Sequence, residues 1–296
     1  MASPETIVLS DVGAGQAKGG RDSQEDRCTI ISPDQFPAQT DEKLAFFAVY
    51  DGHGSEWVAE HASQNLHGLV VKRSEFEQGD YARAIKGALS DEDNMLYKSF
   101  KFEAEEPAFA GSTAAICLIN LTHGELIVAN LGDSHVILAE RDPATDRPFH
   151  IRRLTEAHKP ELPGERQRIE EAGGSVTIRN GTARVESLNI SRALGDLQYK
   201  NPMNSVSDDN FMPATGVLHP SPQRRTLHSE RQYVLVIVSD GVSDRTDDAI
   251  LMQHVMKLAM RGIGADQIAQ EVAYKSSRHP HSDNASCIVA LLEGQS

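Results

Sequence analysis

The sequence lacks any long hydrophobic run. Its longest unbroken apolar segment, Leu44–Tyr50, has seven residues, whereas a membrane-spanning helix needs about twenty. The first residues also lack a basic segment followed by an apolar one, so no signal peptide is expected. The sequence therefore predicts no membrane partner.

Cysteine is scarce, and basic residues are outnumbered. The three cysteines stand far apart in apolar segments and form no CxxC pair, which favours reduced core thiols and an intracellular location, cytoplasmic or nuclear. There are 29 Lys and Arg against 43 Asp and Glu, giving a net charge of −14. This charge disfavours binding to nucleic acid or an anionic membrane, because basic side chains hold those partners.

Several familiar catalytic motifs are also missing. The chain has no P-loop, no GxSxG nucleophile elbow and no GxGxxG run. The glycines at 13, 15, 19 and 20 are therefore expected only in loops. With 296 residues, 39% of them hydrophobic and 24% charged, the chain has an ordinary globular composition and can build its own core.

Short apolar segments rich in β-branched or aromatic residues predict strands. They are Ile7–Leu9, Cys28–Ile31, Leu44–Tyr50, Ala114–Ile119, Leu126–Ala129, Val136–Ala139, Tyr233–Val238 and Cys287–Leu292. Three of them, Leu44–Tyr50, Tyr233–Val238 and Cys287–Leu292, show no polar alternation, so both of their faces should be covered.

Apolar stripes with helical spacing separate the groups of strands. Their residues are Val58, Ala62, Leu66 and Leu69; Tyr81, Ile85, Leu89 and Leu96; Ile250, Leu251, Val255 and Leu258; and Ile268 with Val272. Asp266 is expected to cap the last helix. Because strands come in groups and helices in pairs, the pattern predicts an α+β fold in layers rather than alternating βαβ units.

The segment at about 197–223 shows neither the spacing of apolar residues that is typical of a helix nor that of a strand. It holds four prolines and a cluster of Asn and Asp, and a loop of this length inside a domain is usually functional or mobile. No linker divides the chain, so we expect one domain over residues 1–296, with a variable loop at about 197–223.

Carboxylates stand at the ends of the predicted strands. They are Glu25, Asp26, Asp51, Asp133, Asp240 and Asp283, and glycine follows both Asp51 and Asp240. A single Asp-Gly pair is more simply explained as a strand terminator. Several such carboxylates at one end of a sheet would repel one another, and a hard divalent cation relieves that repulsion. The spacing therefore predicts a Mg²⁺ or Mn²⁺ site.

Two further side chains accompany these carboxylates. Arg21 has the chemistry to bind an anion bidentately, although in isolation a solvated surface arginine is the simpler interpretation. His53 lies between two glycines beside Asp51. Its position is consistent with two interpretations: a proton donor, or a turn residue without a catalytic role.

Together these residues resemble the metal-dependent protein phosphatase 2C family. The matching segments follow in the family's order over about residues 10–292: Arg21–Asp26, Asp51–Gly54, Gly111–Ala114, Gly132–Ser134, Ser191–Asp196, Ser239–Gly241 and Asp283–Asn284. Each segment alone is only weakly specific for the family, but the complete set in this order is very specific for it.

The resemblance implies a central antiparallel β-sandwich flanked by helix pairs, in four layers, with a metal site at one end. It implies two Mg²⁺ or Mn²⁺ ions and allows a weaker third. The implied metal residues are Asp51 as the bridge, the Gly52 carbonyl, Asp240 and Asp283, with Glu25 and Asp26 acting through water and Asp133, with Asp240 and Asp244, at the third position.

The implied activity is hydrolysis of phosphoserine and phosphothreonine in proteins. By resemblance, hydroxide held between the two ions attacks phosphorus, Arg21 binds the substrate phosphate and His53 protonates the leaving group. No covalent phosphoenzyme forms. The expected partners are phosphorylated proteins, and the expected state is a monomer.

Three positions depart from the family pattern, and two alternatives stay open. Ala157, His135 and Ser243 replace an Asp, an Arg and an aromatic residue that are usual in the family. The same chemistry on a small phosphorylated metabolite is one alternative, motivated by the loop at about 197–223. A regulatory relative without turnover is the other, motivated by the departures at Ala157 and Ser243.

Overall fold

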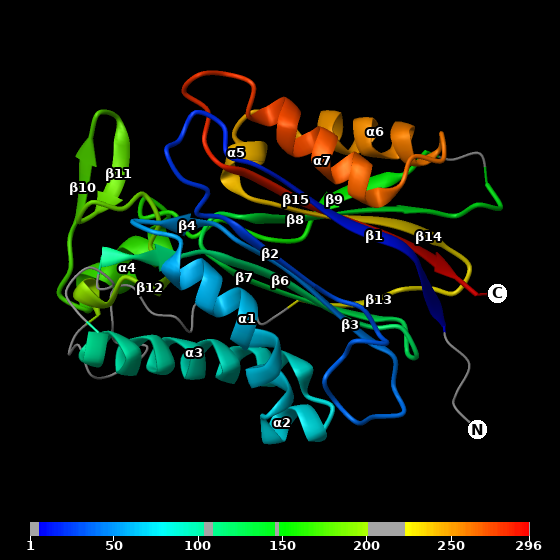
Figure 1. Ribbon diagram of the computed structural model, residues 1–296, viewed down its shortest axis with the longest axis horizontal. Coiled ribbons are helices and arrows are strands. Elements are labelled where there is room, and N and C mark those ends of the chain that lie inside the picture. The colour runs from blue at the N-terminus through cyan, green and yellow to red at the C-terminus, as the bar shows by residue number, and fades with distance from the viewer. Residues whose placement is uncertain (1–5, 104–108, 146–147, 201–222, 296) are drawn as a thin grey trace.

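Two five-stranded antiparallel sheets stack face to face in the computed structural model, which describes residues 6–103, 109–145, 148–200 and 223–295 (Figure 1). The first sheet has the order β1 (Ile7–Ala17), β15 (Ala285–Gly294), β14 (Gln232–Val238), β8 (His135–Arg141) and β9 (His150–Arg153). The second has the order β13 (Gln223–Thr226), β7 (Glu125–Leu131), β6 (Ala114–Asn120), β3 (Leu44–Tyr50) and β2 (Arg27–Ile31).

Helices cover the outer face of each sheet, which gives the four predicted layers (Figure 1). On one side lie α1 (Trp57–Val71), α2 (Ser74–Glu77) and α3 (Tyr81–Glu103), and on the other lie α6 (Asp248–Ala259) and α7 (Ala265–Ser276). None of the described helices combines the length and apolarity needed to span a membrane.

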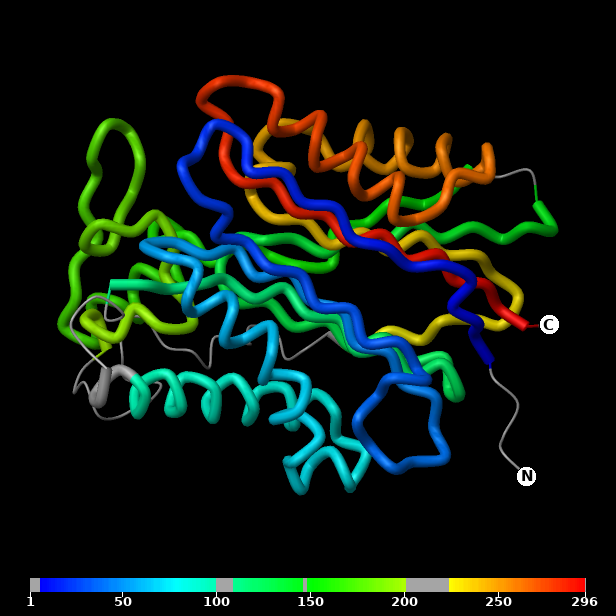
Figure 2. Tube along the Cα trace, viewed as in Figure 1, coloured from blue at the N-terminus to red at the C-terminus, as the bar shows by residue number. Residues whose placement is uncertain are grey.

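Small elements gather at one end of the sandwich. A three-stranded sheet joins β12 (Leu194–Gly195), β5 (Gly111–Ser112) and β4 (Gly52–His53), and a hairpin joins β10 (Val176–Arg179) and β11 (Thr182–Val185). The helices α4 (Pro163–Glu171) and α5 (Asp240–Ser243) and a 3₁₀ turn (Leu197–Tyr199) complete the described elements. Figure 2 shows β1 and β15 running side by side, in agreement with their pairing.

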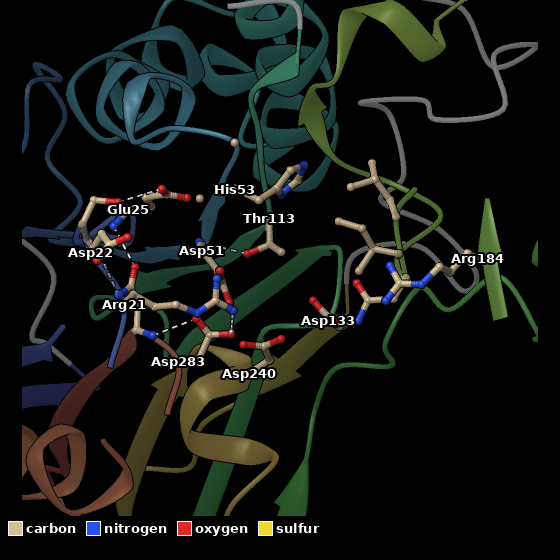
Figure 3. A pocket seen from close by; sticks show the side chains of 17 residues that line it. Arg21, Asp22, Glu25, Asp51, His53, Thr113, Asp133, Arg184, Asp240 and Asp283 are labelled. Carbon is tan, nitrogen blue, oxygen red and sulfur yellow. Dashed lines mark hydrogen bonds and ion pairs between the residues drawn. The ribbon is translucent and has the colours of Figure 1, made fainter. Parts of the chain in front are cut away.

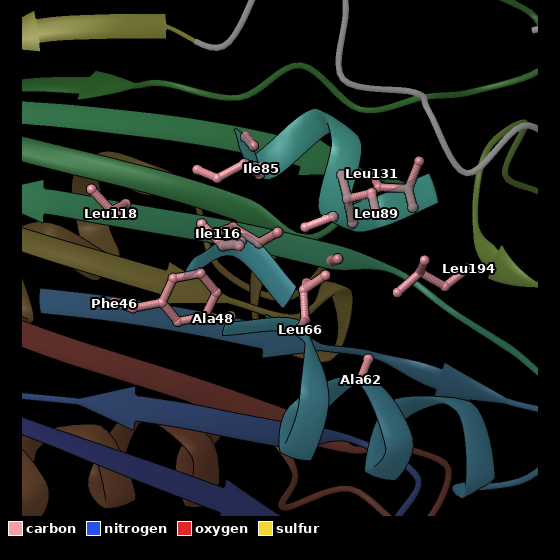
Figure 4. Close-up of a cluster of buried hydrophobic side chains, with 14 of the residues drawn as sticks. Phe46, Ala48, Ala62, Leu66, Ile85, Leu89, Ile116, Leu118, Leu131 and Leu194 are labelled. Carbon is pink, nitrogen blue, oxygen red and sulfur yellow. The ribbon is translucent and has the colours of Figure 1, made fainter. Parts of the chain in front are cut away.

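The predicted burial of the central strands on both faces is confirmed. In β3, Phe46, Ala48 and Tyr50 face the α1–α3 layer, whereas their neighbours Ala45, Phe47 and Val49 face the other sheet. Successive side chains of a strand point to opposite faces, so an unbroken apolar run fills both cores. Figure 4 shows the core beneath α1 and α3.

Three details of the sequence interpretation are wrong. Asp266 does not cap α7, because Gly264 is the N-cap and Asp266 lies in the first turn. Gly13 and Gly15 lie in β1 rather than in a loop. A Cβ atom at either position would come 2.2 Å from a backbone nitrogen of α7. Because glycine has no side chain, the helix can pack directly on the strand. Ile250 is 64% exposed and does not join the buried stripe of α6.

Candidate metal and phosphate site

A pocket of about 490 Å³ opens at the end of the sandwich, among the ends of the strands (Figure 3). The structure brings eight of the ten predicted site residues to this pocket: Arg21, Glu25, Asp51, Gly52, His53, Asp133, Asp240 and Asp283. Asp26 and Asp244 do not line it: Asp26 is 1% exposed and interacts electrostatically with Asp51, and Asp244 interacts electrostatically with Asp133.

The strands explain why these carboxylates meet. Asp51 directly follows β3, and Asp240 opens α5 directly after Ser239 and β14. Asp283 comes two residues before β15, and Asp133 lies in the turn between β7 and β8. Since β3 and β7 belong to one sheet and β8, β14 and β15 to the other, the stacked sheets present these residues at one common end.

Three carboxyl groups of the cluster have raised pKa values. Burial, followed by the charges of Asp26 and Asp240, raises the pKa of Asp51 well above its ordinary value. Burial and the charge of Asp133 raise the pKa of Asp240 to about 7. Burial outweighs hydrogen bonds from Ser286 and Ser239 and raises the pKa of Asp26 to about 6. Burial and the repulsion between neighbouring carboxylates therefore disfavour the ionised forms of these three groups.

Two other carboxylates of the pocket are paired with cations of the protein. Arg21 donates to Asp283 across 2.6 Å, and Lys159 pairs with Asp133. Within the described residues, no three Asp, Glu, His or Cys side chains converge closely enough to hold an ion by themselves. The predicted ligands thus share a pocket, but Asp283 and Asp133 are engaged by cations, and Arg21 contacts a carboxylate.

Thr113 and Asn284 position the backbone of Asp51 and Glu25, although the sequence analysis gave them no role. The Thr113 Oγ1 accepts from the Asp51 amide at 3.1 Å, and the Thr113 amide donates to the Asp51 carbonyl at 2.9 Å. The Asn284 Oδ1 accepts from the Glu25 amide at 2.8 Å, while its Nδ2 donates to the carbonyls of Lys18 and Ser23. The sequence signal was their place in the GST and DN segments.

Backbone carbonyls approach closely to the glycines that follow Asp51 and Asp240. A Cβ atom at Gly52 would lie 2.4 Å from the Glu25 carbonyl oxygen, and one at Gly241 would lie 1.9 Å from the Asn284 carbonyl oxygen. Glycine is thus needed at Gly52 for the Glu25 loop to approach the end of β3.

His53 is held by a residue that sequence reasoning missed. Its Nε2 lies 2.8 Å from the Asp196 Oδ2, and the His53 side chain is 26% exposed while that of Asp196 is 1% exposed. Burial lowers the pKa of His53, but the charge and hydrogen bond of Asp196 outweigh it, so the net pKa lies above its ordinary value. The arrangement favours a protonated imidazole at the edge of the pocket.

The segment from α4 to β12 forms one wall of the pocket through Arg184, Leu188, Asn189 and Ile190. A buried ion-pair cluster anchors this segment: Glu165 accepts from Arg192, Arg168 and the Ser191 hydroxyl. Burial raises the pKa of Glu165, but the hydrogen bonds from Arg192 and Arg168 outweigh it and lower the pKa to about 2. The Arg192 of the SRALGD motif thus has a structural role.

We expect Glu165→Gln to destabilise this wall. Removing one partner from a buried ion pair typically costs about 3–5 kcal/mol, because two guanidinium groups are left without their carboxylate. The depressed pKa means that the stabilisation is complete above the ordinary value of 4.5 and is lost as the pH falls toward about 2. Urea unfolding and amide hydrogen exchange over residues 163–196 measure the loss.

Glu170→Gln on the same helix is the matched control for this prediction. Glu170 is exposed and pairs with Arg166 at the surface, so its substitution should change the free energy of unfolding by less than about 1 kcal/mol. Equal effects of the two substitutions would contradict the anchoring role of Glu165.

Two of the three departures from the family pattern lie close in sequence to the pocket residues Asp133 and Asp240 and carry buried polar atoms. His135 is 6% exposed, its Nδ1 lies 3.2 Å from the Thr155 Oγ1, and burial lowers its pKa to about 4. Ser243 has a buried hydroxyl without a hydrogen-bond partner in the described residues. Neither position lines the pocket.

Comparison with known proteins places this pocket in a family. The model of the protein phosphatase 2C family matches residues 10–285. The chain is 33% identical over 259 residues to protein phosphatase 2C homolog 2 of Hypocrea jecorina, an alignment covering 86% of this chain and 54% of that protein. This chain therefore belongs to the protein phosphatase 2C family.

Solved structures share the fold. A serine-threonine phosphatase 2C from Toxoplasma gondii superposes with a TM-score of 0.78 at 21% identity, covering 98% of this chain and 100% of that chain. A C. elegans sex determining protein gives a TM-score of 0.74 at 26% identity, covering 95% and 64%. The α+β fold with antiparallel sheets is thereby confirmed. The chain spans about half the length of the curated relatives it matches first.

Proposed function

We propose that this chain is a metal-dependent phosphomonoester hydrolase that removes phosphate from phosphoserine and phosphothreonine in proteins. The observation that carries the proposal is the carboxylate pocket at the end of the sandwich, which joins Asp51, Asp240, Asp133 and Asp283 with His53 at its edge. Membership in the protein phosphatase 2C family supports the same activity.

The residues present fit a hard divalent cation. The donors are carboxylate and carbonyl oxygens, which Mg²⁺ and Mn²⁺ prefer. The Asp26 Oδ1 is buried without a hydrogen-bond partner in the described residues. The raised pKa values of Asp51 and Asp240 come first from burial and then from neighbouring negative charge, and a cation would offset both effects. Asp283 and Asp133 can join the set only if Arg21 and Lys159 release them.

A bound divalent cation supplies positive charge for the phosphoryl oxygens and lowers the pKa of the attacking water. The protein's own residues supply the remaining chemistry. Arg21, once released from Asp283, is a bidentate donor for the substrate phosphate. His53 gives a proton to the leaving oxygen of a Ser or Thr side chain, whose alkoxide is a poor leaving group.

The substrate class is tested by comparing kcat/KM for phosphoserine and phosphothreonine peptides with kcat/KM for a panel of phosphorylated metabolites, all in excess Mn²⁺. We expect the peptides to be the better substrates as a class. A strong preference for one metabolite would overturn the protein-phosphatase assignment and leave the site chemistry in place. The loop at about 197–223, which motivated that alternative, lies almost entirely outside the described residues.

A further inference from the structure

The three-stranded sheet beside the pocket brings His53 and Asp196 together across its central strand. His53 on β4 is in register with Gly111 on β5, and Gly195 on β12 is in register with the same glycine. Asp196 directly follows Gly195, and its Oδ2 lies 2.8 Å from the His53 Nε2. The two side chains thus reach from the outer strands and meet over Gly111.

Gly111 leaves the space that this bridge occupies. A Cβ atom at Gly111 would lie 2.2 Å from the Asp196 Oδ2 and 2.4 Å from the His53 Nε2, far inside any van der Waals contact. The hydrogen bond therefore lies directly against the backbone of β5, and any side chain at this position would force the imidazole and the carboxylate apart.

The backbone of Asp196 is fixed independently of His53. Asp196 has φ +48° and ψ +39°, a left-handed conformation that is unfavourable for a residue other than glycine. Its amide donates to the Ala110 carbonyl at 2.8 Å. The preceding Gly195 amide donates to the Asp93 Oδ1 at 2.8 Å, and Asp93 forms a buried ion pair with Lys200. The turn is thus held by groups that do not touch the imidazole.

The Asp196 carboxylate is paired with His53. The residue is fully buried, and within the described residues its Oδ1 has no hydrogen-bond partner. A buried carboxylate with so few partners is costly unless a positive charge lies next to it. The imidazole of His53 lies against this carboxylate and can supply that charge.

We propose that Asp196 is a positioning residue for proton transfer by His53, an inference that rests on the proposed phosphatase function. Asp196 accepts a hydrogen bond from the His53 Nε2–H and so fixes the ring orientation, which leaves Nδ1 as the nitrogen that exchanges a proton. When the bond between phosphorus and the leaving oxygen breaks, its electron pair stays on that oxygen, and the oxygen takes the Nδ1 proton. The Nε2–H remains with Asp196, as in other imidazoles oriented by a carboxylate.

Asp196→Asn tests the proposal through the leaving group. In excess Mn²⁺, we expect kcat/KM to fall about 10- to 100-fold for a phosphothreonine peptide. It should change less than about threefold for 4-nitrophenyl phosphate, whose leaving group needs little protonation. A general structural defect would slow both substrates equally, and that outcome, or no loss on the peptide, would overturn the inference.

A double-mutant comparison asks whether Asp196 acts through His53. Because a positioning residue has no effect without the group it positions, Asp196→Asn added to His53→Ala should cause no further loss on the peptide. Additive losses would contradict the proposal. Gly111→Ala, which pushes the pair apart without changing either side chain, should reproduce the selective loss on the peptide.

A measurement on the wild-type protein keeps the inference independent of both folding and activity. In ¹⁵N-histidine-labelled protein, the Nε2–H of His53 should appear as a slowly exchanging imidazole proton that is absent from His53→Ala. If that proton is present but the wild-type protein hydrolyses neither substrate, the proposed function fails while the contact stands. If the enzyme is active and the proton is absent, the positioning role fails alone.

Discussion

Asp240→Asn is expected to abolish metal-dependent phosphate release while leaving the protein folded. Asp240 opens α5 inside the carboxylate pocket. In its proposed role as a metal ligand, its loss removes several kcal/mol of transition-state stabilisation. That loss corresponds to a fall of about a thousand-fold in kcat/KM. Phosphate release from a phosphothreonine peptide in excess Mn²⁺ measures it.

The same substitution should stabilise the metal-free protein. The raised pKa of Asp240, about 7, means that its native carboxyl group binds protons more tightly than the unfolded one, with its ordinary value of 3.8. The free energy of unfolding therefore falls as the pH rises from about 4 to about 7. In EDTA at pH 7.5 we expect the thermal midpoint of Asp240→Asn to exceed that of the wild type by at least about 2 °C.

Asp266→Asn is the matched control for Asp240→Asn. Asp266 is exposed in the first turn of α7, so its substitution should change neither activity nor, beyond about 0.5 kcal/mol, stability. Wild-type turnover in Asp240→Asn would contradict the metal assignment. A lower thermal midpoint in EDTA would contradict the view that burial and the neighbouring carboxylates penalise the ionised form of Asp240.

His53→Ala should separate substrates by their leaving groups. A general acid contributes about 10²–10⁴-fold where the leaving group needs a proton, so kcat/KM for a phosphothreonine peptide should fall by that factor. For 4-nitrophenyl phosphate the fall should be less than about tenfold, because the aryl oxide leaves readily. Initial rates on both substrates, in the same Mn²⁺ buffer, give the comparison.

His254→Ala is the control for His53→Ala. His254 pairs with Glu271 at the surface of the α6–α7 layer, so both substrates should be hydrolysed at the wild-type rate. Equal losses on both substrates in His53→Ala would remove His53 from the general-acid role.

The central strands and the carboxylate pocket were predictable because their signals are local. An apolar run with both faces buried specifies β3 without reference to the rest of the chain, and its predicted bounds, Leu44–Tyr50, are those of the structure. The carboxylate that follows it, Asp51, must then lie at the strand end. Asp240, just after β14, and Asp283, just before β15, are placed at strand ends for the same reason.

The surroundings of His53 could not be predicted, since they depend on contacts between distant segments. The strands β4, β5 and β12 have two residues each, too few for any period, and Asp196 lies 143 positions from His53 in the sequence. The sequence placed Asp196 in a motif without indicating its partner.

The ion pairs within the pocket could not be predicted from the sequence either. Arg21 was predicted to bind a phosphate, yet in the structure it donates to Asp283, 262 positions away. The sequence analysis predicted no role for Lys159, although this residue forms an ion pair with Asp133. Side-chain pairs of this kind depend on which loops the fold brings together, and neither residue type nor spacing specifies them.

The most direct test of the proposed function is phosphate release from a phosphothreonine peptide, measured in millimolar Mn²⁺ or Mg²⁺ and again in EDTA. The ion is supplied at roughly millimolar concentration because oxygen-ligated, hydrated cations can be bound weakly. We predict release that requires the added ion, stops in EDTA and is restored by further Mn²⁺. Release that persists in EDTA, or no release from either the peptide or an aryl phosphate with the ion present, would contradict a metal-dependent phosphatase.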